Sequence, residues 1–159
     1  MRMPKPDQRV IARRLEIAKR LTEIVPGEGV IVDDDELRAY ETDGLTAYQQ
    51  VPLIVVLPST TDEVRRILRY CHQEGIKVVP RGAGTSLSGG ALPLADGIVL
   101  GLAKFNRILE IDYENRCVIA QPGVTNLGIT DAVANDGFYY APDPSSQIAC
   151  TIGGNVAEN

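Results

Sequence analysis

A glycine-rich loop follows an apolar run near the middle of the sequence. Ile76 to Val79 has the composition of a β-strand, and residues 80–90 then read PRGAGTSLSGG. Glycine loses more backbone freedom on folding than any other residue, so packing alone gives little reason for such a loop. Close approach of backbone N–H groups to an anionic phosphate does give a reason. We therefore interpret residues 80–90 as a phosphate-binding loop, with a plain surface turn as the alternative.

The loop lacks the residues of two familiar nucleotide-binding loops. Gly84 and Gly89 have the spacing of the P-loop, but Gly90-Ala91 stands where that loop requires lysine followed by Ser or Thr. The dinucleotide fingerprint also fails, because Gly82-Ala83-Gly84 is followed by neither a third glycine at the required spacing nor a helix. We therefore expect neither hydrolysis of ATP or GTP nor a Rossmann-type site.

Backbone N–H groups, hydroxyl groups and one cation remain available in the loop. The hydroxyl groups belong to Thr85, Ser86 and Ser88, and the candidate cation is Arg81. A nest of N–H groups with this composition suits a diphosphate that is bound without a metal ion. The loop therefore predicts a dinucleotide held by the backbone.

A strand–helix–strand unit must position this loop. The unbroken apolar run over residues 53–57 predicts a buried strand. Thr60 and Glu63 have the spacing of a capping box, and the helix that follows is predicted to end at Gly75. Its apolar face is predicted to consist of Val64, Ile67, Leu68 and Cys71. The loop then lies at the carboxyl end of the second strand, where open α/β sheets commonly bind ligands.

The segment before this unit is predicted to be helical. One amphipathic helix over residues 7–25 is indicated by the spacing of Val10, Ile11, Leu15, Ala18 and Leu21. Pro26-Gly27 closes it. The acidic run 33–36 is interpreted as the solvated start of another helix, because adjacent carboxylates rarely converge on one metal ion.

The segment after the loop completes the predicted fold. We expect a strand over residues 97–100, a hairpin of 107–112 with 117–120, and a helix over 126–135. Residues 138–159 show little regular periodicity, although Ile152-Gly153-Gly154 is a second place where backbone could approach a ligand. The elements predict an α+β fold, with a small βαβ subdomain followed by part of a mixed sheet with helices. An open sheet edge can pair with another chain, so we expect self-association.

Composition excludes several classes of function. The 16 Lys and Arg residues against 21 Asp and Glu residues give a net charge of −5, which argues against nucleic acid as the main partner. The 3 cysteines form no CxxC pair, which predicts reduced thiols in a cytoplasmic protein. His72 is the only histidine, so we expect neither a metal site nor a histidine-linked cofactor. No apolar run approaches the ~20 residues that a bilayer crossing requires.

Five stretches together resemble a known family. They are residues 79–90, 106–112, 121–124, 142–146 and 150–155, and their order and spacing match across roughly residues 30–159. The sequence resembles FAD-linked oxidases of the vanillyl-alcohol oxidase and p-cresol methylhydroxylase type. Within that family it is most similar to the flavin-binding subunits of bacterial glycolate oxidases, and close to D-lactate dehydrogenases.

The resemblance implies two groups of residues around a non-covalently bound FAD. The pyrophosphate is expected to lie on Arg81, Gly82, Ala83, Gly84, Thr85, Ser86, Gly89 and Gly90. The adenine, ribose and flavin side of the cleft is expected to be lined by Pro142, Asp143, Ser146, Thr151, Ile152, Gly153, Gly154 and Asn155. A plain turn is the alternative for residues 143–146. Cys150 is interpreted as a small buried residue and not as a reactive thiol.

The resemblance also implies a division of the chain. Residues 1–50 are expected to form a helical lead-in, and residues 51–159 the N-terminal part of an FAD-binding domain of the p-cresol methylhydroxylase type. The rest of that domain and the substrate cap lie outside the sequence. We therefore expect an N-terminal fragment of a longer protein.

The function implied for that parent is oxidation of a 2-hydroxy acid, glycolate or D-lactate, by hydride transfer to the flavin. The electrons are expected to pass to an iron–sulfur or other redox subunit, or to a quinone. The expected location is the cytoplasm, in solution or peripheral to the inner face of the membrane. No catalytic base is assigned. Two alternatives stay open: a non-catalytic FAD- or nucleotide-binding fragment or assembly module, and a reductase of the same fold that acts on a nucleotide sugar.

Overall fold

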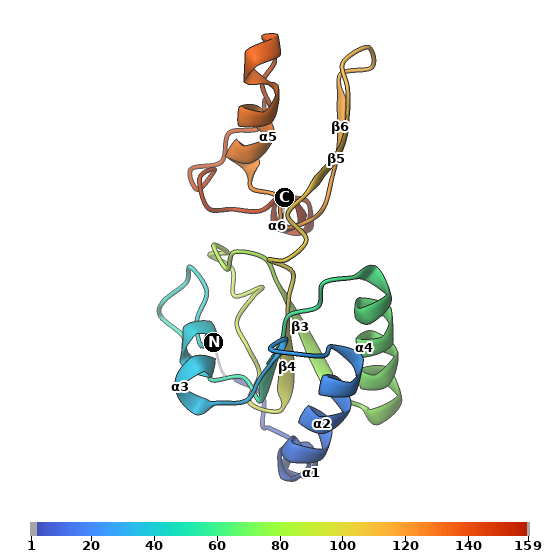
Figure 1. Cartoon of the computed structure of the whole chain (residues 1–159). Helices are drawn as coiled ribbons and strands as arrows, with labels where there is room; N and C mark the ends of the chain where they lie inside the picture. Colours follow the sequence, from blue (N-terminus) through green and yellow to red (C-terminus); the bar gives the residue numbers. More distant parts are fainter. Residues whose placement is uncertain (1–2, 159) are drawn as a thin grey trace.

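The computed structural model describes residues 3–158, which form two lobes (Figure 1). The first lobe contains the four-stranded sheet and the N-terminal helices, and the second contains a hairpin and helix α5 (Asn126–Val133). The sheet has the order β1-β2-β4-β3, with the bounds Val30–Ile31, Ile54–Val56, Gly97–Gly101 and Lys77–Arg81. β1 runs antiparallel to β2, whereas β2, β4 and β3 are parallel, so the sheet is mixed.

The predicted strand–helix–strand unit is present and ends at the glycine-rich loop. Helix α4 (Thr61–Glu74) connects β2 to β3, with Thr60 and Glu63 forming the expected capping box. Gly75 ends the helix in the left-handed conformation, with φ of 66°. The strand β4 lies between β2 and β3, with Ile98 opposite both Ile54 and Val78. This register makes β4 the central strand, and all five of its residues are buried.

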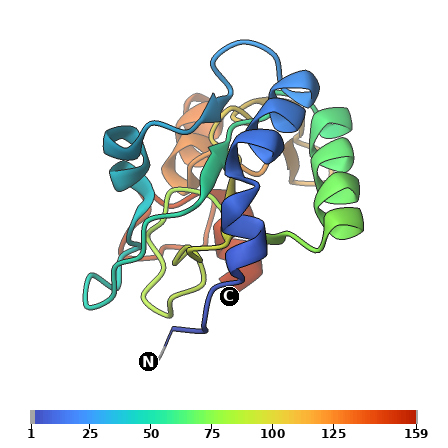
Figure 2. The same cartoon turned by 90° about the horizontal axis from the view of Figure 1, so that it is seen from below.

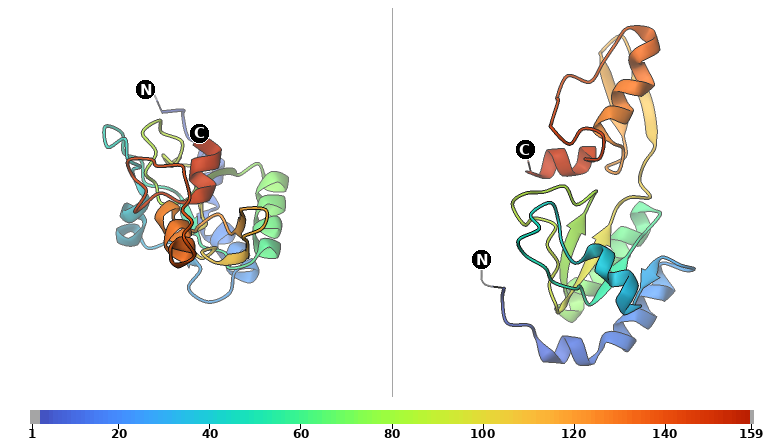
Figure 3. Two further views of the ribbon diagram at one scale, coloured as in Figure 1. Left: turned by 90° about the horizontal axis from the view of Figure 1, so that it is seen from above. Right: turned by 90° about the vertical axis from the view of Figure 1, so that its left-hand side faces the viewer.

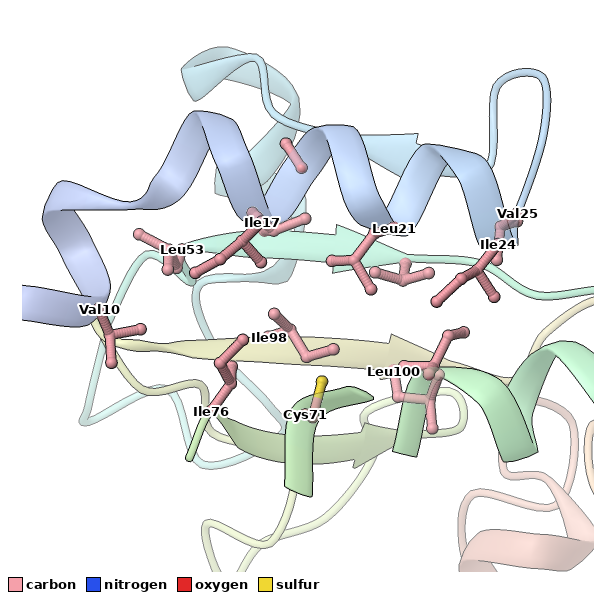
Figure 4. Packing of buried hydrophobic residues seen from close by; sticks show 14 residues of the cluster. Val10, Ile17, Leu21, Ile24, Val25, Leu53, Cys71, Ile76, Ile98 and Leu100 are labelled. Atoms are coloured by element: carbon pink, nitrogen blue, oxygen red, sulfur yellow. The ribbon is translucent and has the colours of Figure 1, made fainter. Parts of the chain in front are cut away.

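Helices cover one face of the sheet and form the main core (Figures 2 and 4). Helices α1 (Gln8–Ala12) and α2 (Arg14–Ile24) lie beside α4. The predicted single helix over residues 7–25 is wrong in one respect, because it is interrupted at Arg13. Leu15 is 82% exposed and therefore lies outside the predicted apolar face. The buried side chains of this core include Val10, Ile17, Leu21, Ile24, Ile67 and Cys71 of the helices and Ile98 and Leu100 of β4.

The interruption at Arg13 has a physical reason. Arg13 has φ of −92° and ψ of 8°, and its guanidinium pairs with Glu16 at 2.9 Å and with Glu74 of α4 at 2.6 Å. Leu15 follows this interruption and is exposed. On α4, Leu68 is also 45% exposed, so it lies at the margin of the predicted apolar face.

The other face of the sheet is covered by a short helical segment. Helix α3 (Asp34–Leu37) begins at Asp33, whose carboxylate accepts hydrogen bonds from the N–H groups of Asp35 and Glu36. The expected helix start in the acidic run is therefore confirmed. The one-turn helix η1 (Arg38–Tyr40) follows, and Leu37 packs on Val55 and Val99 of the sheet.

The second lobe contains a hairpin and helix α5. The hairpin pairs β5 (Ile108–Asp112) with β6 (Cys117–Ala120), and α5 (Asn126–Val133) begins at Thr125. The turn η2 (Ala134–Asp136) then ends at Gly137 in the left-handed conformation, as its sequence predicts. Within the described residues the hairpin has no further strand beside it. Self-association through such edges stays a prediction.

Residues 138–159 show little regular periodicity, yet they contain a helix near their end. Helix α6 (Ile152–Glu158) lies there, between the two lobes (Figure 3). Two glycines lower its helix propensity, so no periodic pattern marks it. Tertiary contacts set its start: Ile152 donates to the carbonyl of Val124 and Gly153 to that of Pro122, both at backbone hydrogen-bond distance. Asn159 lies outside the described residues.

Membrane, metal and thiol features of the chain are few. Over residues 3–158 no helix has both the length and the apolar character needed to cross a bilayer. The same residues contain no group of three His, Cys, Asp or Glu side chains that could hold a metal ion. Cys71, Cys117 and Cys150 are free thiols, and burial raises the pKa of the Cys71 thiol to about 11.

Candidate cofactor-binding site

The glycine-rich loop opens onto a cavity of about 980 Å³ between the lobes. Three segments that are distant in sequence meet there: the loop after β3, residues 142–146, and the start of α6. Figure 3 shows α6 facing the loops at the end of the sheet. The predicted residues that line the cavity are Arg81, Gly82, Ala83, Gly84, Thr85, Ser86, Gly90, Pro142, Asp143, Ser146, Thr151, Gly153, Gly154 and Asn155.

Two predicted residues, Gly89 and Ile152, are not among the lining residues. Gly89 has φ of 78°, and its carbonyl accepts a hydrogen bond from the N–H of Leu92. It therefore shapes the turn that ends the loop. Ile152 is held by its N–H group on the carbonyl of Val124, at 2.8 Å. It therefore anchors the start of α6 beside the cavity.

Backbone N–H groups are available on the loop. Over residues 3–158, no protein group accepts a hydrogen bond from the N–H groups of residues 83–86. Gly84 has φ of 73°, a conformation that glycine adopts without strain. A neighbouring hydroxyl also faces the loop, since a Cβ atom on Gly82 would overlap Oγ1 of Thr151. The loop thus presents several donors to one small volume.

The Thr151 hydroxyl is buried without a partner in the described chain. Thr151 is 7% exposed, and its Oγ1 atom makes no hydrogen bond to residues 3–158. A buried hydroxyl without a partner costs about 1–3 kcal/mol. Because Thr151 lines the cavity beside Gly82, a rotation about its Cα–Cβ bond could bring the enclosed Oγ1 atom to a ligand oxygen there. The free N–H groups and this hydroxyl fit the diphosphate of FAD.

Arg81 lines the cavity, but its guanidinium group is held on the side of segment 40–44. Its Nη1 atom donates to the carbonyl of Thr42 at 2.7 Å, and its Cζ atom lies 5.7 Å from the centre of the Tyr40 ring. Burial lowers the pKa of the Arg81 guanidinium, and the nearby Asp43 carboxylate acts in the opposite direction. Sequence reasoning missed this support, because Thr42 lies 39 positions earlier.

A carboxylate also reaches the loop. Ser86 donates from Oγ to Oε2 of Glu158 at 2.7 Å, and a Cβ atom on Gly90 would overlap Oε1 of Glu158. Glu158 is exposed and belongs to the last turn of α6. An anionic side chain therefore occupies space directly beside the donors of the loop.

Sequence reasoning missed further lining residues. They are Pro80, Leu87, Ala91, Leu102, Pro122, Pro144, Cys150, Ala157 and Glu158. Pro80 and Leu87 belong to the glycine-rich segment itself, and Pro122 belongs to the motif at 121–124. These three residues could therefore have been predicted from motifs already identified in the sequence. A second cavity of about 540 Å³ shares Gly82, Ala83 and Thr151 with the first. His72 is exposed on α4 and lines neither cavity.

Comparisons with known proteins agree with this geometry. Residues 52–159 match the family model described as FAD binding domain. The glycolate oxidase subunit GlcD of Escherichia coli (strain K12) is 54% identical over 146 residues, which cover 92% of this chain and 29% of that protein. D-lactate dehydrogenase of Anaerostipes hadrus is 35% identical over 145 residues, covering 91% of this chain and 30% of that protein.

A solved structure shows the same fold. p-Cresol methylhydroxylase with bound substrate matches with a TM-score of 0.79 at 20% identity, over 97% of this chain and 30% of that one. The predicted α+β fold of this type is therefore confirmed. The chain spans about three tenths of the length of the curated relatives named above. Because the family model covers more than half of the sequence, the chain belongs to the family of FAD binding domains, and its cofactor is FAD.

Proposed function

We propose that this chain holds the pyrophosphate of FAD within a longer enzyme that oxidises a 2-hydroxy acid. Glycolate and D-lactate are the candidate substrates, since relatives named glycolate oxidase subunit and D-lactate dehydrogenase match most of the chain. The observation that carries the proposal is one cavity lined both by residues 83–86, whose N–H groups have no acceptor in the described chain, and by Thr151, whose buried hydroxyl has no partner there. We assign residues 51–159 to the FAD-binding domain and residues 1–50 to its helical lead-in.

The residues of this chain would bind and orient the cofactor. The N–H groups of residues 83–86 and the Thr151 hydroxyl would donate to the pyrophosphate oxygens. The segments at 142–146 and 153–155 would line the remaining length of the dinucleotide. When bound, FAD supplies the chemistry by accepting the hydride from the hydroxyl-bearing carbon. We propose non-covalent binding, since His72 lies away from both cavities.

We propose further that the electrons pass to an iron–sulfur or other redox subunit, or to a quinone. The word subunit in the name of the Escherichia coli relative supports an assembly with other chains. The cytoplasm, in solution or at the inner face of the membrane, is the location that we propose. Free thiols at Cys71, Cys117 and Cys150 support a reducing compartment.

Retention of FAD tests the proposal most directly. The purified chain is mixed with FAD and desalted, and its visible spectrum is recorded. We expect flavin absorption bands at about 370 and 450 nm to remain after desalting. FMN serves as the control, because it has the same flavin without the diphosphate bridge and should be lost. A spectrum without flavin bands after FAD treatment would contradict a working site in this chain.

Turnover separates the enzyme from a non-catalytic module. The FAD-loaded chain is assayed with glycolate or D-lactate and a dye as electron acceptor. The alternative, an FAD-binding module without turnover, is favoured by one feature of the cavity. Its acidic and thiol side chains are Asp143, Cys150 and Glu158, and none of them makes a hydrogen bond or an ion pair with a basic side chain in the described residues. FAD retention without dye reduction would support that alternative for the chain by itself.

A Glu158→Gln substitution should tighten FAD binding. The Glu158 carboxylate accepts a hydrogen bond from Ser86 and repels a diphosphate on the same loop. Removal of one exposed charge should strengthen binding by about threefold to tenfold, which is about 0.7–1.4 kcal/mol. FAD fluorescence titrations measure this, with Glu114→Gln in the distant hairpin turn as the control of equal net charge. If both variants bind FAD with equal affinity, the Glu158 carboxylate moves away from the loop on FAD binding at no cost in free energy, and the prediction is wrong.

A further inference from the structure

We propose that Arg81 is a positioning residue that supports the glycine-rich loop through contacts with segment 40–44 and does not contact the pyrophosphate. The proposal rests on the proposed function of residues 81–90 as the pyrophosphate site. It concerns the one cationic side chain of that loop, which by sequence alone is the obvious partner for an anion. The contacts of its guanidinium group carry the argument.

The guanidinium group is bound to segment 40–44. Nη1 of Arg81 donates to the carbonyl of Thr42 at 2.7 Å, and Cζ lies 5.7 Å from the centre of the Tyr40 ring. A planar guanidinium makes a directed hydrogen bond and a stacking contact at the same time, which a lysine ammonium cannot do. Both contacts are made with residues outside the loop. Arg81 therefore ties the end of β3 to the segment that follows η1.

The loop lies directly on this contact. A Cβ atom on Gly84 would overlap the Arg81 guanidinium, so the loop backbone passes over it with no room for a side chain. On the same side, a Cβ atom on Gly44 would lie 2.8 Å from the carbonyl oxygens of both Thr85 and Ser86. Segment 40–44 therefore packs against both the guanidinium and residues 85–86, and the guanidinium packs against Gly84. A change at Arg81 should therefore shift the loop.

The charge of Arg81 is also balanced on that side. Asp43 is 4% exposed, and its Oδ1 atom accepts a hydrogen bond from the N–H of Leu45 at 2.9 Å. Its Oδ2 atom has no hydrogen-bond partner in the described chain. The Asp43 carboxylate favours the charged form of Arg81, whose pKa burial lowers. A guanidinium whose charge is balanced by a buried carboxylate is left with less attraction for a diphosphate.

Two substitutions at one position separate the two roles. Arg81→Lys keeps the positive charge, and Arg81→Gln removes it. If Arg81 positions the loop, both variants should bind FAD about tenfold more weakly, because neither restores the stacked contact. The salt dependence of FAD affinity should then stay that of the unsubstituted chain. If Arg81 contacts the pyrophosphate, Arg81→Lys should retain most of the affinity and Arg81→Gln should lose salt dependence.

Hydrogen exchange supplies a readout that needs no cofactor. In both variants without FAD, the amides of Ser88 and Leu92, which donate to Oγ of Ser86 and to the carbonyl of Gly89, should exchange about tenfold faster, and those of β4 should keep their rates. Tyr40→Leu, which removes the ring beneath the guanidinium, should speed the same loop amides while Arg81 is intact. Unchanged loop exchange in all three variants, or full FAD affinity in Arg81→Lys, would overturn the proposal. Failure of the unsubstituted chain to bind FAD would instead contradict the proposed function, and exchange would still decide the role of Arg81.

Discussion

A Gly44→Ala substitution is expected to abolish the retention of FAD through desalting, although Gly44 does not line the cavity. The added methyl group would lie 2.8 Å from the carbonyl oxygens of Thr85 and Ser86 and 3.1 Å from the carbonyl carbon of Thr85. These are backbone atoms, so no side chain can rotate away, and the loop itself must shift. Overpacking of this kind costs about 1–3 kcal/mol. The loop can relax away from the methyl group when FAD is absent, but must return to bind FAD. The cost of overpacking then weakens FAD binding by up to about a hundredfold.

FAD titration of the Gly44→Ala variant measures this effect, and Gly27→Ala is its control. Gly27 has φ of 80° and no atom within 4 Å of an added Cβ, so alanine there brings backbone strain without a clash. That strain costs about 1–2 kcal/mol of stability, in the turn after α2 and outside the cavity lining. The control should therefore unfold more easily and still bind FAD. Equal loss of FAD binding in both variants would show that lower stability, and not a shift of residues 84–86, is responsible.

The contrast between Gly84 and Gly44 shows what the sequence could predict. Gly84 stands in a dense motif after a strand, so its closeness to a ligand is visible from local spacing. Gly44 stands in an irregular segment, and its importance depends on contacts with Thr85 and Ser86, about forty positions later. No local pattern reports such a contact. The layer beneath the loop could therefore be found only in three dimensions.

Local rules also explain which elements were predicted correctly. The capping box at Thr60 and Glu63 and the left-handed Gly75 are complete within a few residues, and the structure has both. Helix α6 depends on contacts with Val124 and Pro122 and contains two glycines, so neither propensity nor periodicity marks it. Gly153 is tightly fitted, since an added Cβ would lie 2.6 Å from Cβ of Pro122. The motif at 121–124 therefore fixes the position of the first turn of α6 at the site.

A Thr151→Val substitution is expected to act in opposite directions on the stability of the chain and on its affinity for FAD. Valine has nearly the shape of threonine but has no hydroxyl group. In the FAD-free chain, Oγ1 of Thr151 is buried without a partner in the described residues, so its removal should raise the free energy of unfolding by about 1–2 kcal/mol. With FAD bound, the same hydroxyl would donate to a pyrophosphate oxygen. Its loss should weaken binding by about tenfold, or about 1.4 kcal/mol.

Urea unfolding of the FAD-free chain and FAD titration measure the two effects separately. A rise in the urea midpoint with an unchanged slope would show a gain in stability alone. Thr22→Val is the matched control, because the Thr22 hydroxyl has a partner, the carbonyl of Ala18 at 3.0 Å, and lies in α2. That variant should gain no stability from relief of an unpaired group and should bind FAD normally. Opposite signs at Thr151 require that the hydroxyl is kept for a ligand, because a purely structural hydroxyl would lower stability when removed. A fall in the stability of Thr151→Val, with FAD affinity unchanged, would therefore remove Thr151 from the site.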